Sequence, residues 1–360
     1  MMSLKYAFSP IRVGPLELKN RFIRSATGLS LSELNGKPKK ELFEEYKKLA
    51  DGEIGLIISG HAYPLRNGRA TPNQSGFYAR WIVNQYKPIV DNIHSKGGKF
   101  IFQICHGGLH SVGYEDDETK DPTPILSPSG DSFMFDDPNH KSLAKSMNKT
   151  EIDDVISSFG RAAFMAQQIG ADGIQIHAAH GYLLSEFLSP FFNRRTDEYG
   201  GSIENRLRIV QEIINEIRRI TKPSFSCSIK MNGFDGYNEK HNRLITPELC
   251  SEYVKRLKNL DFFEISSSFS VLEGKYKSSF KKAIGKKIKL PKRMFNLQAA
   301  EIIKKANPDK IIASVGGHRY INEIEDVLKS KKVDLISIST PLISNPYAIK
   351  EMKEGKISHC

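Results

Sequence analysis

The segment DGIQIHAAHGY, at residues 172–182, combines a strand pattern with three side chains that can donate hydrogen bonds or protons. Side chains alternate between the two faces of a strand, so Ile174 and Ile176 share one face while Gln175 and His177 share the other. We expect the apolar face to pack against helices and the polar face to point into a barrel. An unpaired polar group there is costly, and a bound polar ligand would satisfy it.

Seven other runs have the same strand-like character, and segments of helical period separate most of them. They are Arg21–Ala26, Ile54–Ser59, Lys99–Cys105, Phe225–Met231, Phe262–Ser266, Lys310–Ser314 and Val333–Ile338. One apolar stripe at helical spacing comprises Ile203, Leu207, Val210, Ile214 and Ile217. Eight strands alternating with helices predict an α/β fold of the (β/α)8 TIM-barrel type.

Further segments extend this barrel at both ends. Residues 11–18 predict a β-hairpin around Gly14 and Pro15, placed to close the bottom of the barrel. Long connections at residues 107–149 and after the sixth strand follow strands. They therefore belong on the C-terminal face, where barrel enzymes carry their chemistry. No composition break divides the chain, so we expect a single domain over residues 1–360.

Bulk properties restrict the class of protein. The hydrophobic content of 39% over 360 residues is ample for a full core, and no apolar run is long enough to span a membrane. The first residues lack the apolar stretch of a secretory signal, so a cytoplasmic protein is expected. The cysteines form no C-x-x-C pair, which argues against a zinc or iron–sulfur site; they are Cys105, Cys227, Cys250 and Cys360.

Positive charge is concentrated in one stretch. Residues 274–293 carry eight lysines and one arginine without an acidic residue, and they account for most of the formal net charge of +12. Such a stretch is usually a solvated loop. It could instead steer an anion such as NAD(P)H toward a nearby opening.

The pair His177 and His180 is the first candidate for chemistry. Residues three apart on a straight strand point to opposite sides, so the two imidazoles converge only if the chain turns after His177. The small residues Ala178, Ala179 and Gly181 permit that turn. Convergent imidazoles could hold one carbonyl oxygen. Two ordinary histidines bonded to backbone remain an alternative, and no third ligand supports a metal site.

The string from Asp172 to Arg208, with Leu18–Arg21, the segment from Gln103 to His106 and the Gly316–Gly317 pair, resembles the old yellow enzyme family of flavin-dependent reductases. The resemblance implies FMN as cofactor and NADH or NADPH as reductant. It implies that His177 and His180 bind the carbonyl or nitro oxygen of the substrate, and that Tyr182 protonates the substrate's α-carbon.

The resemblance also assigns positions that contact the flavin. Ser25, Ala26 and Thr27 end the first strand beside the ring, Gly60 lets the ring approach the backbone, and Gln103 binds the pyrimidine edge. A departure follows at Gly28, where the family often has a threonine or cysteine near flavin O4. That departure implies a flavin potential different from the family norm.

Lys230 matches the family's cation beside flavin N1 and O2. A buried cation there stabilises the reduced, negative flavin. The alternative is a lysine inside the barrel that pairs with Glu264.

Phosphate binding is expected in the loops after strands seven and eight, at Ser314, Gly316, Gly317, Ser339 and Thr340. The family usually has an arginine after strand eight, where this chain has Thr340. That difference implies weaker FMN binding, or compensation by another cation such as Arg319.

The expected activity is reduction of activated C=C bonds, or of a quinone, by a ping-pong hydride relay. Two other functions stay open. One is a phosphate-binding barrel isomerase or aldolase that uses Lys230 as base or Schiff-base former. The other is a non-enzymatic barrel that binds an acidic partner through residues 274–293. We expect a small-molecule partner, no nucleic acid and no membrane. The natural substrate, the choice of nicotinamide and any homo-oligomer are not predicted.

Overall fold

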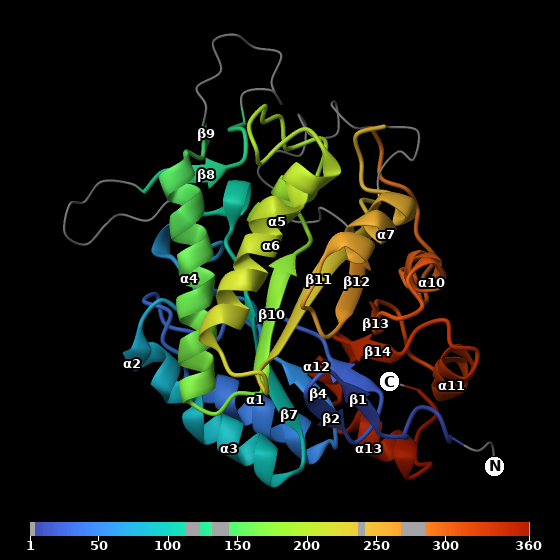
Figure 1. Cartoon of the computed structure of the whole chain (residues 1–360). Coiled ribbons are helices and arrows are strands. Elements are labelled where there is room, and N and C mark those ends of the chain that lie inside the picture. The colour runs from blue at the N-terminus through green and yellow to red at the C-terminus, as the bar shows by residue number, and fades with distance from the viewer. Residues whose placement is uncertain (1–3, 113–122, 132–143, 237–241, 268–284, 360) are drawn as a thin grey trace.

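Eight parallel strands close into a barrel in the computed structural model (Figure 1). The structure describes residues 4–112, 123–131, 144–236, 242–267 and 285–359. Each strand pairs with its neighbours in chain order, and the last pairs with the first. The barrel strands are β3 (Phe22–Arg24), β4 (Leu56–Ile58), β7 (Lys99–Ile104), β10 (Gly173–Ala178), β11 (Ser226–Phe234), β12 (Phe263–Ser267), β13 (Ile312–Val315) and β14 (Leu335–Ile338).

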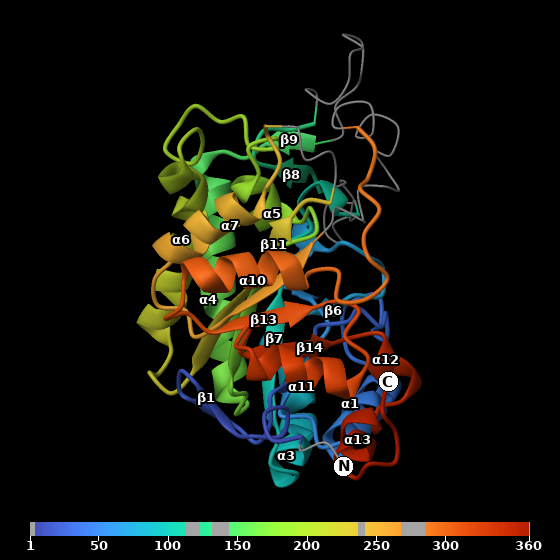
Figure 2. The ribbon, with the colours of Figure 1, turned by 90° about the vertical axis from the view of Figure 1, so that its right-hand side faces the viewer.

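Helices between successive strands cover the outside of the barrel, as Figures 1 and 2 show. They are α1 (Lys40–Asp51), α3 (Lys87–Ser95), α4 (Lys149–Gln168), α6 (Ile203–Ile220), α7 (Pro247–Arg256), α10 (Leu297–Ala306) and α11 (Ile321–Lys329). Short helices complete the cover: α2 (Arg80–Val83), α5 (Leu183–Leu188), α12 (Pro341–Ser344) and α13 (Ala348–Lys353). The predicted (β/α)8 architecture is therefore confirmed.

Local sequence signals explain where the long helices begin. Asn148 caps α4 in a capping box with Glu151, and the Ser202 side chain accepts a hydrogen bond at the start of α6. Thr246 caps α7 just before Pro247, a residue that suits the first helical position. The apolar stripe predicted between residues 203 and 217 faces inward, with Leu207, Val210, Ile214 and Ile217 buried in α6.

The N-terminal hairpin closes the bottom of the barrel. Strands β1 (Ile11–Val13) and β2 (Leu16–Leu18) pair antiparallel, as the sequence predicts. Their side chains form one core cluster with residues that point into the barrel from its strands: Val13, Leu16, Leu18, Ile23, Leu56, Ile58, Ile101, Phe262, Ala313 and Leu335. The lower half of the barrel is therefore apolar and packed, which leaves the upper half for polar groups.

The opposite end of the barrel carries the long connections. Figure 2 shows β8 (Ile125–Ser127) and β9 (Ala144–Ser146) at the end away from β1. Strands β5 (Ala62–Tyr63) and β6 (Ser75–Gly76) extend the sheet beside β7. Much of the connection at 107–149 and residues 274–284 of the lysine-rich stretch lie outside the described residues. Within the described ranges, no helix is long and apolar enough to cross a membrane.

Candidate active site

A chain of buried polar side chains crosses the upper barrel. Gln103 Nε2 donates to Gln175 Oε1 at 2.6 Å, and Gln175 Nε2 donates to Glu264 Oε2 at 2.9 Å. The ammonium of Lys230 lies 3.3 Å from the same Glu264 oxygen and donates to Ser25 Oγ at 2.8 Å. The strand register produces this chain, since Gln103 pairs with Gln175 and Lys230 pairs with Glu264 across adjacent strands. The inward direction predicted for Gln103, Gln175 and Lys230 is therefore observed.

The charge of Lys230 is balanced within the protein. Its partner Glu264 is fully buried, so the ion pair that the sequence left open as an alternative is present. Glu264 Oε1 has no hydrogen-bond partner among the described residues. The pair does not exclude a ligand, because an ammonium has three donors and the described residues use two of them.

A left-handed turn brings the two histidines together. Strand β10 ends at Ala178, and His180 and Gly181 then adopt φ values of 65° and 79°. Glycine favours that conformation, while a histidine there is uncommon and is held by its surroundings. The rings of His177 and His180 lie 5.1 Å apart at 82° to each other. His177 is 3% exposed, and its Nδ1 has no partner among the described residues.

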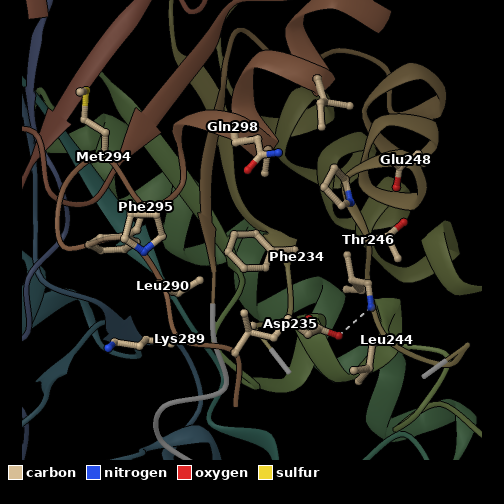
Figure 3. Close-up of a pocket in the computed structure, with 17 residues that line it drawn as sticks. Phe234, Asp235, Leu244, Thr246, Glu248, Lys289, Leu290, Met294, Phe295 and Gln298 are labelled. Atoms are coloured by element: carbon tan, nitrogen blue, oxygen red, sulfur yellow. Dashed lines mark hydrogen bonds between the residues drawn. The ribbon is translucent and has the colours of Figure 1, made fainter. Parts of the chain in front are cut away.

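A buried relay of hydrogen bonds fixes His180. Its backbone N–H donates to Asn232 Oδ1 at 3.1 Å, and Asn232 Nδ2 donates to Asp235 Oδ1 at 3.2 Å. The second Asp235 oxygen accepts from the backbone N–H of Ile245 at 2.7 Å, the dashed line in Figure 3. The His180 ring is held separately, because Nε2 lies 2.8 Å from Ser266 Oγ. Residues from β11 and β12, the two barrel strands that follow β10, therefore position this histidine.

Tyr182 completes the cluster, and a third histidine lies beside it. The phenol ring is 4.9 Å from the His177 ring and 5.5 Å from the ring of His61. The Tyr182 hydroxyl lies 3.5 Å from His61 Nε2. His61 was not predicted from the sequence. The available signal was a histidine directly after Gly60, at the end of the second barrel strand.

Burial keeps these imidazoles neutral near pH 7. Desolvation, followed by the charges of neighbouring groups that include Lys230, lowers the pKa of His180 to about 3 and of His61 to about 4. The pKa of His177 falls well below its usual value, and desolvation is again the largest cause. A neutral imidazole still has one N–H donor, so the pair can bind an oxygen without carrying positive charge.

A glycine-lined cavity of about 340 Å³ lies at the carboxyl ends of the barrel strands, beside β13 and β14. Gly316 and Gly317 have φ values of 117° and 72°, and a Cβ on Gly317 would lie 2.6 Å from the backbone nitrogen of Met294. Both positions therefore require glycine. Eight of the predicted site residues line this cavity or its entrance: Ser25, Ala26, His180, Lys230, Gly316, Gly317, Ser339 and Thr340.

Two cations besides Lys230 line the same cavity. Thr340 stands where the family usually has arginine, and Lys292 and Arg319 are in the wall around it. The sequence named Arg319 as a compensating cation but not Lys292. His318 also lines the cavity and was missed. Nε2 of His318 lies 3.1 Å from Oγ of Ser314, a residue predicted to bind phosphate. Ser314 itself does not line the cavity, so its hydroxyl supports His318.

The remaining predicted contacts lie nearby. Thr27 Oγ1 is 2.9 Å from Ser339 Oγ, which joins the ends of β3 and β14. A Cβ on Gly60 would lie 2.7 Å from the carbonyl oxygen of Thr27, so the backbone approaches closely there. Thr27 and Gly60 line a smaller cavity of about 130 Å³ together with His61. Gln103 stays inside the barrel, in the chain that leads to Lys230.

A second, larger cavity of about 540 Å³ lies between the end of β11, the start of α7 and the segment before α10 (Figure 3). Phe234, Leu244 and Leu290 give it an apolar character, with Lys289 at its edge. Phe295 lines both this cavity and the glycine-lined one. Asp235 also lines this cavity, so the hydrogen-bond relay that holds His180 extends to the cavity wall.

These residues fit a flat cofactor that carries a phosphate. The glycine cradle and its cations suit the phosphate, while the unpaired atoms His177 Nδ1 and Ser337 Oγ show that polar groups at the mouth lack partners within the described chain. Such an arrangement is that of a barrel enzyme which binds a nucleotide-like cofactor at the carboxyl ends of its strands. The chain belongs to the NADH:flavin oxidoreductase / NADH oxidase family, the old yellow enzyme family, whose sequence model matches residues 7–358.

Individual relatives agree with this family. An NADPH dehydrogenase of Halalkalibacterium halodurans is 28% identical over 96% of this chain and 93% of its own length. A 2-naphthoyl-CoA reductase has a similar fold, with a TM-score of 0.85 and 23% identity over 99% of this chain and 54% of that one. The old yellow enzyme homologue from Zymomonas mobilis gives a TM-score of 0.75 and 22% identity over 98% and 94% of the two chains.

The protein is therefore an FMN-dependent oxidoreductase with NAD(P)H as reductant. The isomerase or aldolase alternative does not fit this family. The alternative of an acidic partner depends on residues 274–293, of which 274–284 lie outside the described residues.

Proposed function

We propose that this enzyme reduces electron-poor alkenes, such as α,β-unsaturated carbonyl compounds and nitroalkenes. His177 and His180 hold the carbonyl or nitro oxygen, and Tyr182 protonates the α-carbon. The observation that carries the proposal is that Nδ1 of the buried His177 has no partner among the described residues, while its ring packs against the rings of His180 and Tyr182. A buried polar atom without a partner calls for a ligand atom.

The electrostatics support an oxygen ligand. Both histidines are neutral, so each offers an N–H donor to an oxygen that gains negative charge during the reaction. His180 uses Nε2 toward Ser266, which leaves Nδ1 for the substrate. The hydrogen bond from the His180 backbone N–H to Asn232 and the contact of Nε2 with Ser266 hold His180 before substrate arrives, and preorganised donors are the effective ones.

FMN, when bound, would supply the chemistry of hydride transfer between NAD(P)H and the acceptor. Ser25, Ala26, Thr27, Gly60 and Gln103 would contact the ring, and Lys230 would supply positive charge beside it. The backbone of Gly316 and Gly317, with Ser339, Thr340 and the Lys292 and Arg319 side chains, would hold the phosphate. Ser314 would act through His318.

Spectroscopy of the purified protein tests the proposal. We expect a yellow protein after FMN loading, bleached anaerobically by NADH or NADPH and then reoxidised by 2-cyclohexenone with saturated ketone as product. Bleaching followed by failure of both 2-cyclohexenone and nitrostyrene to reoxidise the protein would exclude alkene reduction and leave another acceptor, such as a quinone.

A further inference from the structure

His61 lies against the hydroxyl of Tyr182, and its ring is also 6.2 Å from the ring of His177. Its Nε2 is 3.5 Å from the phenolic oxygen, and the rings of His61 and Tyr182 are 5.5 Å apart. Within the described part of the chain, this is the hydrogen bond made by that hydroxyl. A change in the protonation of the Tyr182 hydroxyl therefore acts directly on His61, its hydrogen-bond partner.

Loss of that proton would leave a costly anion. Burial raises the pKa of Tyr182 above its ordinary value, so the phenol is fully protonated before reaction and its anion is strongly disfavoured afterwards. The phenol is 6% exposed, which limits direct protonation by bulk water. A donor beside the oxygen would remove the anion as it forms.

The environment of His61 suits that task. Its pKa of about 4 keeps the ring neutral, with one N–H donor and one acceptor nitrogen. The ring lines a cavity of about 130 Å³ whose other walls include Thr71, Asn73, Gln74 and Ser75. A polar cavity of this size has room for water molecules. His61 thus separates the Tyr182 hydroxyl from a polar space in which water can supply protons.

Gly28 makes the position of His61 possible. A Cβ at residue 28 would lie 3.1 Å from His61 Cε1, closer than ordinary packing allows. The backbone of His61 is held as well, because its carbonyl oxygen accepts from Gln74 Nε2 at 3.3 Å. Gly28, at a position where relatives often have a side chain, therefore leaves room for the His61 ring beside Tyr182.

We propose that His61 is a positioning residue that returns a proton to Tyr182 in each turnover, an inference that rests on the proposed alkene reduction. Once hydride has reached the β-carbon, the Tyr182 O–H bond breaks and a C–H bond forms at the α-carbon. The His61 Nε2–H bond then breaks as the phenolic O–H bond forms again. His61 Nδ1 gains a proton from water in the small cavity, so the net proton comes from solvent and the ring stays neutral. Proton exchange with water then moves the ring proton from Nδ1 back to Nε2 before the next turnover.

The test uses the FMN-loaded enzyme, reduced anaerobically by NADPH, with His61→Gln as the main variant. We expect steady-state turnover of NADPH with 2-cyclohexenone to slow about tenfold or more, because a general acid that is not reloaded between turnovers limits the repeated reaction. Reduction by NADPH and reoxidation by ferricyanide should be unchanged, since neither needs a proton on carbon. His110→Gln is the matched control. Its ring also packs against Tyr182, at 5.4 Å, and we expect that variant to keep the full rate.

The outcomes separate the two proposals. If wild-type enzyme does not reduce 2-cyclohexenone, alkene reduction itself fails. If wild-type enzyme does so and His61→Gln matches it, only the role of His61 fails. An equal slowing with ferricyanide would also overturn that role, since it would show a structural defect. If His61→Gln loses FMN, His61→Ala is tested with added imidazole. Restored enone turnover supports the relay, and no restoration contradicts it.

Discussion

The two ends of the active site are built in different ways. The proposed catalytic end takes His177, His180 and Tyr182 from one strand and the turn that follows it. The proposed phosphate end is assembled from separate loops, which contribute Lys292, the Gly316–Gly317 pair and the Ser339–Thr340 pair. The catalytic end matches the family pattern, while the phosphate end lacks its usual arginine.

The difference follows from what each end must do. Catalysis needs donors at fixed positions around one oxygen, and a single turn with two left-handed residues provides that geometry. A phosphate needs backbone N–H groups and positive charge nearby, and the charge can come from any loop within reach. We therefore expect variants at the catalytic end to impair turnover and variants at the phosphate end to impair FMN binding.

The largest expected effect is at the catalytic end. His177→Ala should slow enone-dependent reoxidation about 10²–10³-fold, because removing one oxyanion donor costs about 3–4 kcal/mol of barrier. FMN content and reduction by NADPH should stay at wild-type levels. Stopped-flow measurement of the two half-reactions checks both points. His180→Asn, which keeps an amide donor, is the control and should lose less. Enone turnover unaffected by His177→Ala would refute the assignment.

The sequence predicted that the side chains of His177, His180 and Tyr182 come together, because these residues lie close together in the chain. Strand alternation placed Gln175 and His177 inside the barrel, and the small residues after His177 indicated the turn. His61, Lys292 and His318 were missed because each comes from a different loop, and no local pattern links a loop residue to a site that three-dimensional packing creates. The ion pair of Lys230 with Glu264 was named only as an alternative, since the choice depended on strand register.

A smaller effect is expected at Asp235, which supports the catalytic end. Burial raises its pKa to about 7, whereas an unfolded aspartate titrates near ~3.9. A raised carboxyl pKa stabilises the fold most below pH ~3.9, and that stabilisation is lost as the pH rises to about 7. Asp235→Asn removes this dependence. The variant should therefore be more stable relative to wild type at about pH 8 than at about pH 5.

The free energy of unfolding of Asp235→Asn minus that of wild type is expected to rise by on the order of 2–3 kcal/mol between about pH 5 and about pH 8. Urea unfolding of both proteins at the two pH values measures it. Asp261→Asn is a control, because Asp261 is a carboxylate paired with Arg218 at the other end of β12. A constant difference between Asp235→Asn and wild type would show that Asp235 is ionised throughout this range.

The smallest effect is expected at the phosphate end and would sharpen the comparison. Lys292→Ser should weaken FMN binding about tenfold, which corresponds to ~1.4 kcal/mol for one lost charge-assisted contact. Lys289→Ser is the matched control, because Lys289 comes from the same stretch but lines the larger cavity of Figure 3. Fluorescence titration of the apoprotein with FMN compares the two variants. With FMN at saturation, both should reduce enones at the wild-type rate. Equal loss of affinity in both would mean that the lysine-rich stretch acts through its overall charge, and a turnover defect in Lys292→Ser alone would show that the two ends are coupled.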